Sequence, residues 1–368
     1  MLWQTLQPSG WRVLRLEPRA GRSSRRADGR LPDFAKPIVL SIRTGRLPVF
    51  RSIRYKAGWT GVKPICGEDG MTDASAKHAE IAAQVVAGGK VFNEETIASF
   101  APLYGALLAV RSNAGVQIDA DIAYGPDADR NLLDVHAPVD RSKPRPVVIF
   151  FHGGGLVRGS KTTPGSPYYG NIANFFAANG IVGINATYRL APAIQWPEGS
   201  RDVAAALQWA RDNIANFGGD PGRIVLMGHS AGATHVANYV FRQELHPSSG
   251  PGFAGAILQS GVYGIDADNP PPNHLAYYGD DKSQYSLRQM IGNVTFCDFP
   301  LLMTVAEYDP VRFESGAYRL LAELVDKSAP RPQIKQFLQH NHITPAMAVG
   351  TGDADVEGTL LSFMHKFD

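Results

Sequence analysis

The chain has 368 residues, of which 44% are hydrophobic and 19% are charged, and its formal net charge is +2. This composition is typical of a globular protein that buries its core without disulfides, and we expect a soluble, cytoplasmic protein of one or two domains. The near-neutral charge argues against nucleic-acid binding, no apolar run is long enough to span a membrane, and Cys66 and Cys297 form neither a disulfide framework nor a metal-binding pattern.

Residues 1–70 carry a strong basic excess, with 14 Lys and Arg against 5 Asp and Glu. Three interpretations are open: a targeting peptide, a basic nucleic-acid-binding arm, or a flexible extension with no role in the fold. We favour the flexible extension, because the segment lacks the long apolar core of a secretory signal and has little aromatic interleaving. Met71 followed by Asp and Ser helix-capping residues resembles a natural start.

Residues 71–115 are predicted to form a helical N-terminal segment. Apolar residues recur at helical spacing over 73–89 and 93–110, and Asn93 followed by two glutamates is a good helix start. Such a pair of helices can pack on the core or cap a pocket. In the capping interpretation, Phe100 and Tyr104 contribute an apolar wall to the substrate site.

From residue 116 onward, short strands and helices alternate, which is typical of an α/β protein with a mostly parallel central sheet flanked by helices. We assign residues 116–368 to this one domain. Strands are predicted near residues 116–124, 130–137, 146–151, 181–187, 223–228, 254–260, 300–306 and 333–339. Helices are predicted near residues 167–179, 199–216, 231–244, 313–327 and 353–367.

An insertion at residues 264–297 interrupts this alternation. Because segments that follow strands often carry loops over an active site, we interpret it as a pocket wall or lid. Its Tyr277 and Tyr278, together with Leu156 of a glycine-rich loop, are predicted to contact the substrate. A modest apolar pocket of this kind favours short acyl chains.

The sequence Gly228-His-Ser-Ala-Gly232 lies between a short apolar strand and an apolar helix. A serine at such a turn projects from the sheet edge, and glycines two residues before and after it avoid a steric clash. The motif by itself also fits an ordinary glycine-rich turn. Its strand–turn–helix context favours Ser230 as a nucleophile.

A serine nucleophile needs donors for the oxyanion, a base and an acid that orients the base. The loop His152-Gly-Gly-Gly155 follows an apolar strand and can turn backbone N–H groups toward a substrate, and the N–H of Ala231 can supply another donor.

The acid and the base are sought after the next strands along the chain. Asp309 follows an apolar strand and is preferred as the acid to Glu307, its closest rival, and to Asp298, which precedes that strand. His342 is preferred to His340 as the base, because it lies farther out in its loop. His152 and His229 are expected to orient loops rather than transfer protons.

An HGGG loop before a GHSAG elbow resembles the α/β-hydrolase fold esterases and lipases, close to the hormone-sensitive lipase group. Tyr188-Arg-Leu-Ala-Pro192 and Gly219-Asp-Pro-Gly-Arg223 are similar to segments of that group. The resemblance covers residues 116–368. It implies Ser230, Asp309 and His342 as a catalytic triad, and the backbone of Gly154, Gly155 and Ala231 as an oxyanion hole.

Two features depart from the lipase group: His229 stands where that group usually has Asp, and the base lies in a His-Asn-His-Ile segment. Both are similar to arylformamidases and small feruloyl-type carboxylesterases. The sequence therefore predicts a serine carboxylesterase acting on a small-molecule ester through an acyl-enzyme, with no metal and no cofactor.

The alternatives are an arylformamidase or amidase on the same site, a non-catalytic binding protein on a hydrolase scaffold, and an added binding module in residues 1–70. The sequence leaves open whether the chain is a monomer or a homodimer. Asp202 is interpreted as a helix-start or structural residue.

Overall fold

The structure is a computed structural model. It describes residues 4–6, 11–15, 39–43, 68–111, 114–163, 165–327 and 330–368. Contacts divide the chain into two units, Met1–Pro64 and Ile65–Asp368. Most of residues 1–70, and with them the prediction of a flexible extension, lie outside the described residues.

The first unit contains a small antiparallel sheet with strand order β1-β2-β3. Its strands are β1 (Gln4–Leu6), β2 (Trp11–Arg15) and β3 (Val39–Arg43). The sequence analysis predicted no strand here. At three to five residues, each strand is too short for its alternating pattern to stand out among the surrounding Pro, Gly and Arg.

The second unit is built on an eight-stranded sheet with order β11-β10-β9-β8-β6-β7-β5-β4. The six strands from β11 to β7 in this order pair in parallel, whereas β5 pairs antiparallel with β7 and β4. The strands are β4 (Val116–Ala123), β5 (Leu132–Pro138), β6 (Arg145–Phe151), β7 (Val182–Ala186), β8 (Gly219–His229), β9 (Gly255–Gln259), β10 (Leu301–Tyr308) and β11 (Gln333–Asn341).

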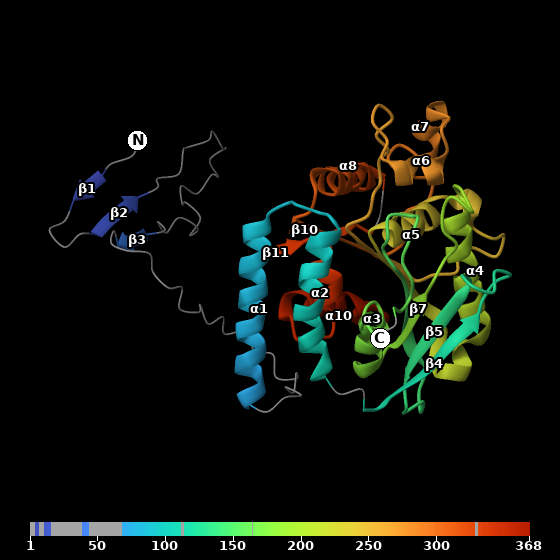
Figure 1. The fold of residues 1–368 in the computed structure, drawn as a ribbon, viewed down its shortest axis with the longest axis horizontal. Coiled ribbons are helices and arrows are strands. Elements are labelled where there is room, and N and C mark those ends of the chain that lie inside the picture. Colours follow the sequence, from blue (N-terminus) through green and yellow to red (C-terminus); the bar gives the residue numbers. More distant parts are fainter. Residues whose placement is uncertain are drawn as a thin grey trace, which may run out of the picture. The chain divides into compact units, whose positions relative to one another are not determined.

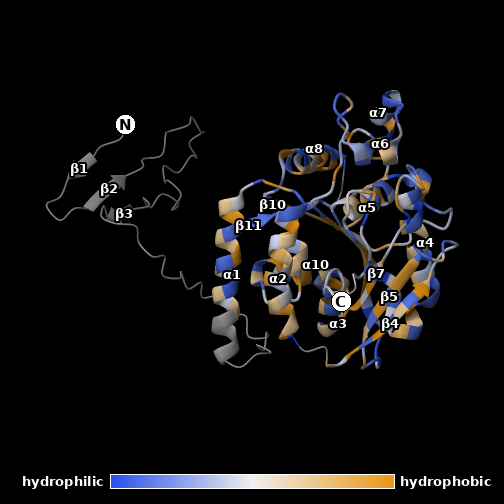
Figure 2. Cartoon of the chain, in the orientation of Figure 1, coloured by the Kyte–Doolittle hydropathy of each residue, from blue (hydrophilic) through white to orange (hydrophobic). Residues whose placement is uncertain are grey.

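The central strands are apolar throughout because both faces of the sheet are covered. Successive residues of β6 point to opposite faces: Val147 and Ile149 join one core cluster, and Val148 and Phe150 join the other. Helices α4, α5 and α8 pack on the first cluster, and α1, α2, α3, α9 and α10 pack on the second. Figure 2 shows the hydrophobic residues along β5 and β7.

Helices α1 and α2 lie side by side, and α6 and α7 stand at the top of Figure 1. Among the described residues, no helix combines the length and apolar character needed to cross a membrane. The helices are α1 (Glu68–Gly88), α2 (Glu94–Ala109), α3 (Gly170–Ala178), α4 (Glu198–Asn213), α5 (Ala231–Phe241), α6 (Pro272–Tyr278), α7 (Tyr285–Arg288), α8 (Val311–Lys327), α9 (Thr344–Ala348) and α10 (Ala354–Met364). Short 3-10 helices are η1 (Ile214–Phe217), η2 (Gln243–Leu245), η3 (Lys282–Gln284) and η4 (His365–Phe367).

The predicted α/β class with a mostly parallel sheet is confirmed. Each predicted strand and helix from residue 116 onward has a counterpart, with ends that differ by a few residues, as helix and strand ends commonly do. Helix α1 begins at Glu68, before the predicted start at residue 73. Helices α6, α7 and α9 were not predicted, because four to seven residues are too few to display helical periodicity.

Asp202 links the start of α4 to the loop after β7. Its carboxylate accepts hydrogen bonds from the backbone N–H of Arg189 at 2.8 Å and from the guanidinium Nη2 at 2.7 Å. Asp202 is buried, whereas Glu198, the second carboxylate on Arg189, is 30% exposed at its side chain. The contact accounts for Asp202 as a structural residue, as the sequence predicted.

We expect Asp202→Ala to lower the free energy of unfolding by about 3 kcal/mol, because it leaves a hydrogen-bonded cation without its buried partner. Glu198→Ala removes the more exposed partner of the same guanidinium and should cost less than about 1 kcal/mol. Urea unfolding of both variants measures the difference. Equal losses would contradict the structural role of Asp202.

Candidate active site

Ser230 occupies a strained turn between β8 and α5. Its φ angle is +54°, in the left-handed region that a residue with a side chain seldom adopts. A Cβ atom added to Gly228 would lie 2.4 Å from the carbonyl carbon of Gly232, and one added to Gly232 would lie 2.0 Å from the carbonyl oxygen of Phe151. Both glycines are therefore required by close backbone packing, for the reason inferred from the sequence.

A line of hydrogen bonds joins Ser230, His342 and Asp309. The Ser230 Oγ lies 2.8 Å from His342 Nε2, and His342 Nδ1 lies 2.7 Å from Asp309 Oδ1. Because a carboxylate can only accept, Nδ1 carries the proton and Nε2 is free to accept from the serine hydroxyl. The three residues follow β8, β11 and β10, whose carboxyl ends meet at one edge of the sheet.

Asp309 is fully buried and both of its carboxylate oxygens are hydrogen-bonded. Its Oδ2 accepts from the Ser260 hydroxyl and from the Ala306 N–H, each at 2.7 Å. Burial alone would raise the pKa of Asp309, but the hydrogen bond and charge of His342 and the two donors on Oδ2 hold the pKa below its usual value. Asp309 is therefore a carboxylate at neutral pH.

The alternative acid and base, Glu307 and His340, contact other groups. Glu307 accepts a hydrogen bond from the Gln339 N–H at 2.7 Å. His340 Nε2 lies 3.2 Å from an Asp353 carboxylate oxygen, and its Nδ1 lies 3.1 Å from the Thr344 hydroxyl. Of the residues weighed from the sequence, Asp309 and His342 are the two brought next to Ser230.

The glycine-rich loop passes close to the serine: a Cβ added to Gly153 would lie 3.3 Å from the Ser230 Cβ. Gly154 and Gly155 have φ angles of +133° and +62°, and a Cβ at Gly154 would lie 2.0 Å from the Arg158 carbonyl oxygen. In the part of the chain that the structure describes, the N–H groups of Gly154, Gly155 and Ala231 have no hydrogen-bond acceptor. Unpaired N–H groups beside a nucleophile can receive an oxyanion.

Two other histidines hold the loops around the serine. His229 Nε2 lies 2.8 Å from the His342 carbonyl oxygen, and His152 Nδ1 lies 2.7 Å from the Gly153 carbonyl oxygen. Burial lowers the pKa of each to about 3, so both are neutral donors at pH 7. Each therefore has a short contact to loop backbone, the kind of role expected from the sequence.

Two phenylalanines that the sequence analysis did not single out pack against His342. The ring centre of Phe313 lies 3.9 Å from that of His342, and the ring centre of Phe92 lies 4.5 Å from it. Phe313 stands four residues after Asp309 at the start of α8, so its position in the sequence could have indicated that it lies near the site. Phe92 comes from the connection between α1 and α2, and no local pattern marks it.

The residues predicted to contact substrate lie in two buried clusters. Leu156, Tyr277 and Tyr278 share one cluster with Ala231, next to the serine. Phe100 and Tyr104 belong instead to the core cluster on which α1, α2, α3, α9 and α10 pack. Their contact with a substrate stays a prediction.

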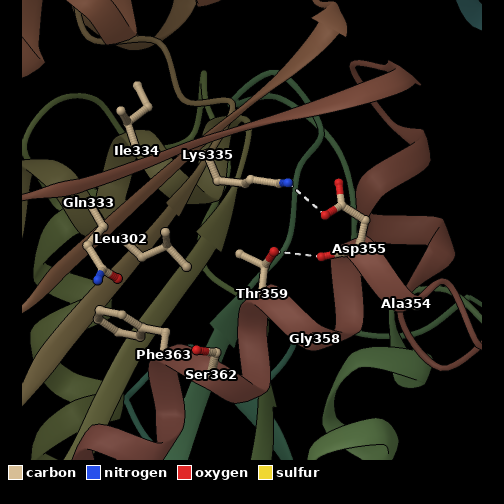
Figure 3. A pocket seen from close by; sticks show the side chains of 10 residues that line it. All are labelled: Leu302, Gln333, Ile334, Lys335, Ala354, Asp355, Gly358, Thr359, Ser362 and Phe363. Atoms are coloured by element: carbon tan, nitrogen blue, oxygen red, sulfur yellow. Dashed lines mark hydrogen bonds and ion pairs between the residues drawn. The ribbon is translucent and has the colours of Figure 1, made fainter. Parts of the chain in front are cut away.

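A hollow of about 580 Å³ lies away from these residues, between β10, β11 and α10 (Figure 3). Its charged residues are already paired, since Lys335 contacts Asp355 at 2.6 Å. Among the described residues, no group of three or more His, Cys, Asp or Glu side chains is arranged to hold a metal ion.

We compared the sequence and the fold of this chain with those of known proteins. Residues 126–270, which include the glycine-rich loop and Ser230, match the carboxylesterase family. The chain has the α/β-hydrolase fold. Esterase B from Lactobacillus rhamnosis superposes with a TM-score of 0.57 at 19% identity, covering 81% of this chain and 96% of that one.

Curated relatives are similar over part of their length. Phenmedipham hydrolase of Pseudarthrobacter oxydans is 33% identical over 244 residues, which is 63% of this chain and 38% of the relative. Carboxylesterase 1D of Rattus norvegicus is 30% identical over 240 residues, which is 62% of this chain and 34% of the relative. The chain thus spans little more than a third of the length of these relatives.

The buried histidines predict a steep dependence of stability on pH. Burial lowers the pKa of His152, His229 and His235 to about 3, whereas an unfolded histidine titrates near pH 6.5. Between these values the unfolded chain binds protons that the native chain does not. The free energy of unfolding should therefore fall as the pH drops from about 6.5, by up to about 1.4 kcal/mol per pH unit for each histidine.

Urea unfolding between pH 7 and pH 4 measures this slope. His235→Gln should reduce the slope by about 1.4 kcal/mol per pH unit. His365→Gln, at an exposed side chain, serves as the matched control and should change the slope less than His235→Gln does. An unaltered slope in His235→Gln would mean that this histidine is not held neutral in the native state.

Proposed function

We propose that this chain is a serine hydrolase that cleaves carboxylic esters through an acyl-enzyme. The observation that carries the proposal is the unbroken line from Ser230 Oγ to His342 to Asp309, with hydrogen bonds of 2.8 and 2.7 Å. A serine, an imidazole and a buried carboxylate in this order form the arrangement that activates a hydroxyl for attack on a carbonyl.

In the proposed reaction, His342 Nε2 takes the proton of Ser230 as Oγ attacks the ester carbonyl. Asp309 keeps the other ring proton on Nδ1 and stabilises the imidazolium that forms. His342 then gives its proton to the departing alcohol. Water attacks the acyl-enzyme by the same route and releases the acid.

The negative charge on the carbonyl oxygen would be received by the N–H groups of Gly154, Gly155 and Ala231. Two observations support this role: these N–H groups have no acceptor among the described residues, and Gly153 of the same loop passes close to Ser230. Ala231 is also the first residue of α5, so the helix N-terminus adds favourable potential there. Such donors are typically worth about 10²–10³ in rate each.

We propose short acyl or aryl esters as substrates. The site is closely packed, since Ser230 is 8% exposed and two phenylalanines lie against His342. The buried tyrosines Tyr277 and Tyr278 and the side chain of Leu156 limit the space near Ala231. A long acyl chain would have to displace these groups.

Ser230→Ala should lower kcat for a short ester by about a thousandfold or more, because it removes the attacking atom. A fluorophosphonate should form a covalent adduct with the wild type at Ser230 and none with the variant, as measured by mass spectrometry. Ser362→Ala, at an exposed serine of α10, should retain both properties. A wild type that neither hydrolyses esters nor is labelled would instead indicate a binding protein.

A substrate panel tests the acyl preference and the competing amide chemistry. We expect kcat/KM to be highest for p-nitrophenyl acetate or butyrate and to fall toward decanoate, because longer chains meet the packed walls. Methyl ferulate and an N-formyl aryl amine complete the panel. Turnover mainly of the formamide would replace the esterase proposal with an arylformamidase.

A further inference from the structure

The connection between α1 and α2 crosses the surface of the active site. We call residues 90–94 the strap. At its centre, the Phe92 ring lies edge-on to His342, with 4.5 Å between ring centres and an interplanar angle of 70°. The same ring makes an edge contact with Phe313, at 6.3 Å between centres. The strap therefore places an aromatic side chain against the imidazole of His342.

Both ends of the strap are held by ion pairs to the two sides of the site. Lys90 Nζ lies 2.6 Å from a carboxylate oxygen of Glu314, in the first turn of α8. At the other end, Glu94 pairs with Arg158. Arg158 belongs to the glycine-rich loop, since its N–H donates to the Gly154 carbonyl oxygen at 3.1 Å. The strap thus bridges α8 and the proposed oxyanion loop.

The two ion pairs, which we call the anchors of the strap, are weak enough to break. The side chains of the first pair are 41% and 25% exposed, and those of the second are 57% and 81% exposed. Exposed pairs of this kind contribute little and are screened by salt. The strap also begins beside Gly88 and Gly89, where an added Cβ would meet no atom within 4 Å. Gly89 has a φ angle of +57°, and a glycine adopts other backbone conformations without a side-chain clash.

We propose that the strap covers the alcohol side of the scissile bond and that Phe92 limits the size of the alcohol. This inference rests on the proposed function. His342 must hand a proton from Nε2 to the departing alkoxide, so the alcohol lies against the imidazole as the bond breaks. Phe92 and Phe313 pack on that imidazole, and only Phe92 is carried by a segment with releasable anchors.

The size limit is tested with two ester series. One varies the alcohol of a butyrate from methyl to naphthylmethyl, and the other varies the acyl group of a methyl ester from butyrate to octanoate. In Phe92→Ala, the ratio of kcat/KM for naphthylmethyl butyrate to that for methyl butyrate should rise about tenfold. The acyl ratio should change less than twofold.

Two further variants control this test. Val91→Ala changes a neighbouring strap residue that is 57% exposed and should leave both ratios as in the wild type. Phe92→Leu keeps an apolar side chain in place and should give a smaller rise than Phe92→Ala. An unchanged alcohol ratio in Phe92→Ala, or a change in the acyl ratio instead, would overturn the inference.

The anchors are tested by charge reversal. Lys90→Glu should raise the alcohol ratio two- to fivefold by opposing Glu314, and the double variant Lys90→Glu/Glu314→Lys should restore the wild-type ratio. Lys327→Glu reverses a charge at another ion pair of α8, whose lysine side chain is 43% exposed, and should have no effect. A double variant that behaves like Lys90→Glu would overturn the anchoring role.

These results separate the two proposals. If methyl butyrate is hydrolysed and Ser230 is labelled, but the alcohol ratio does not respond to Phe92, the strap inference fails and the esterase proposal stands. If neither hydrolysis nor labelling occurs in the wild type, the esterase proposal fails, and the strap inference fails with it.

Discussion

The buried carboxylate of Asp309 is the charge around which the site is arranged. Taking a carboxylate out of water costs several kcal/mol unless hydrogen bonds replace the lost hydration. One oxygen accepts a hydrogen bond from His342, and the other accepts hydrogen bonds from the Ser260 hydroxyl and the Ala306 N–H. These donors come from the ends of β9, β10 and β11, so stabilising this charge requires that three neighbouring strands end in register.

The orientation of His342 depends on that carboxylate and on its surroundings. Asp309 fixes the ring proton, His229 contacts the backbone carbonyl, and Phe92 and Phe313 limit the movement of the ring. The imidazole is 1% exposed. Its geometry toward Ser230 is therefore set by contacts on every side rather than by the serine itself.

Much of the fold and the site could be predicted because the signals were local. The strand–turn–helix pattern around Ser230 and the glycines of both loops report backbone geometry that a few adjacent residues determine. The preference for Asp309 over Glu307, and for His342 over His340, followed from their positions past a strand end. The family match ends at residue 270, before both residues, so their placement beside Ser230 comes from the structure.

Contacts between distant segments could not be predicted. Ser260 donates to Asp309 from the end of another strand, and Phe92 reaches His342 from a connection far earlier in the chain. Each is an ordinary residue in its own neighbourhood. Their importance depends on tertiary packing, which composition and periodicity do not encode.

The pairing of β6 has a consequence for how the chain acquires its structure. This strand is apolar on both faces, and its neighbours β7 and β8 come much later in the chain, with β8 ending at His229. Until that residue leaves the ribosome, β6 lacks one partner and exposes an edge together with apolar side chains. Such long-range parallel pairing slows folding and leaves the nascent chain prone to association. Strand β8 therefore has two roles: it positions Ser230 at its end, and its synthesis supplies the partner that covers the exposed edge of β6.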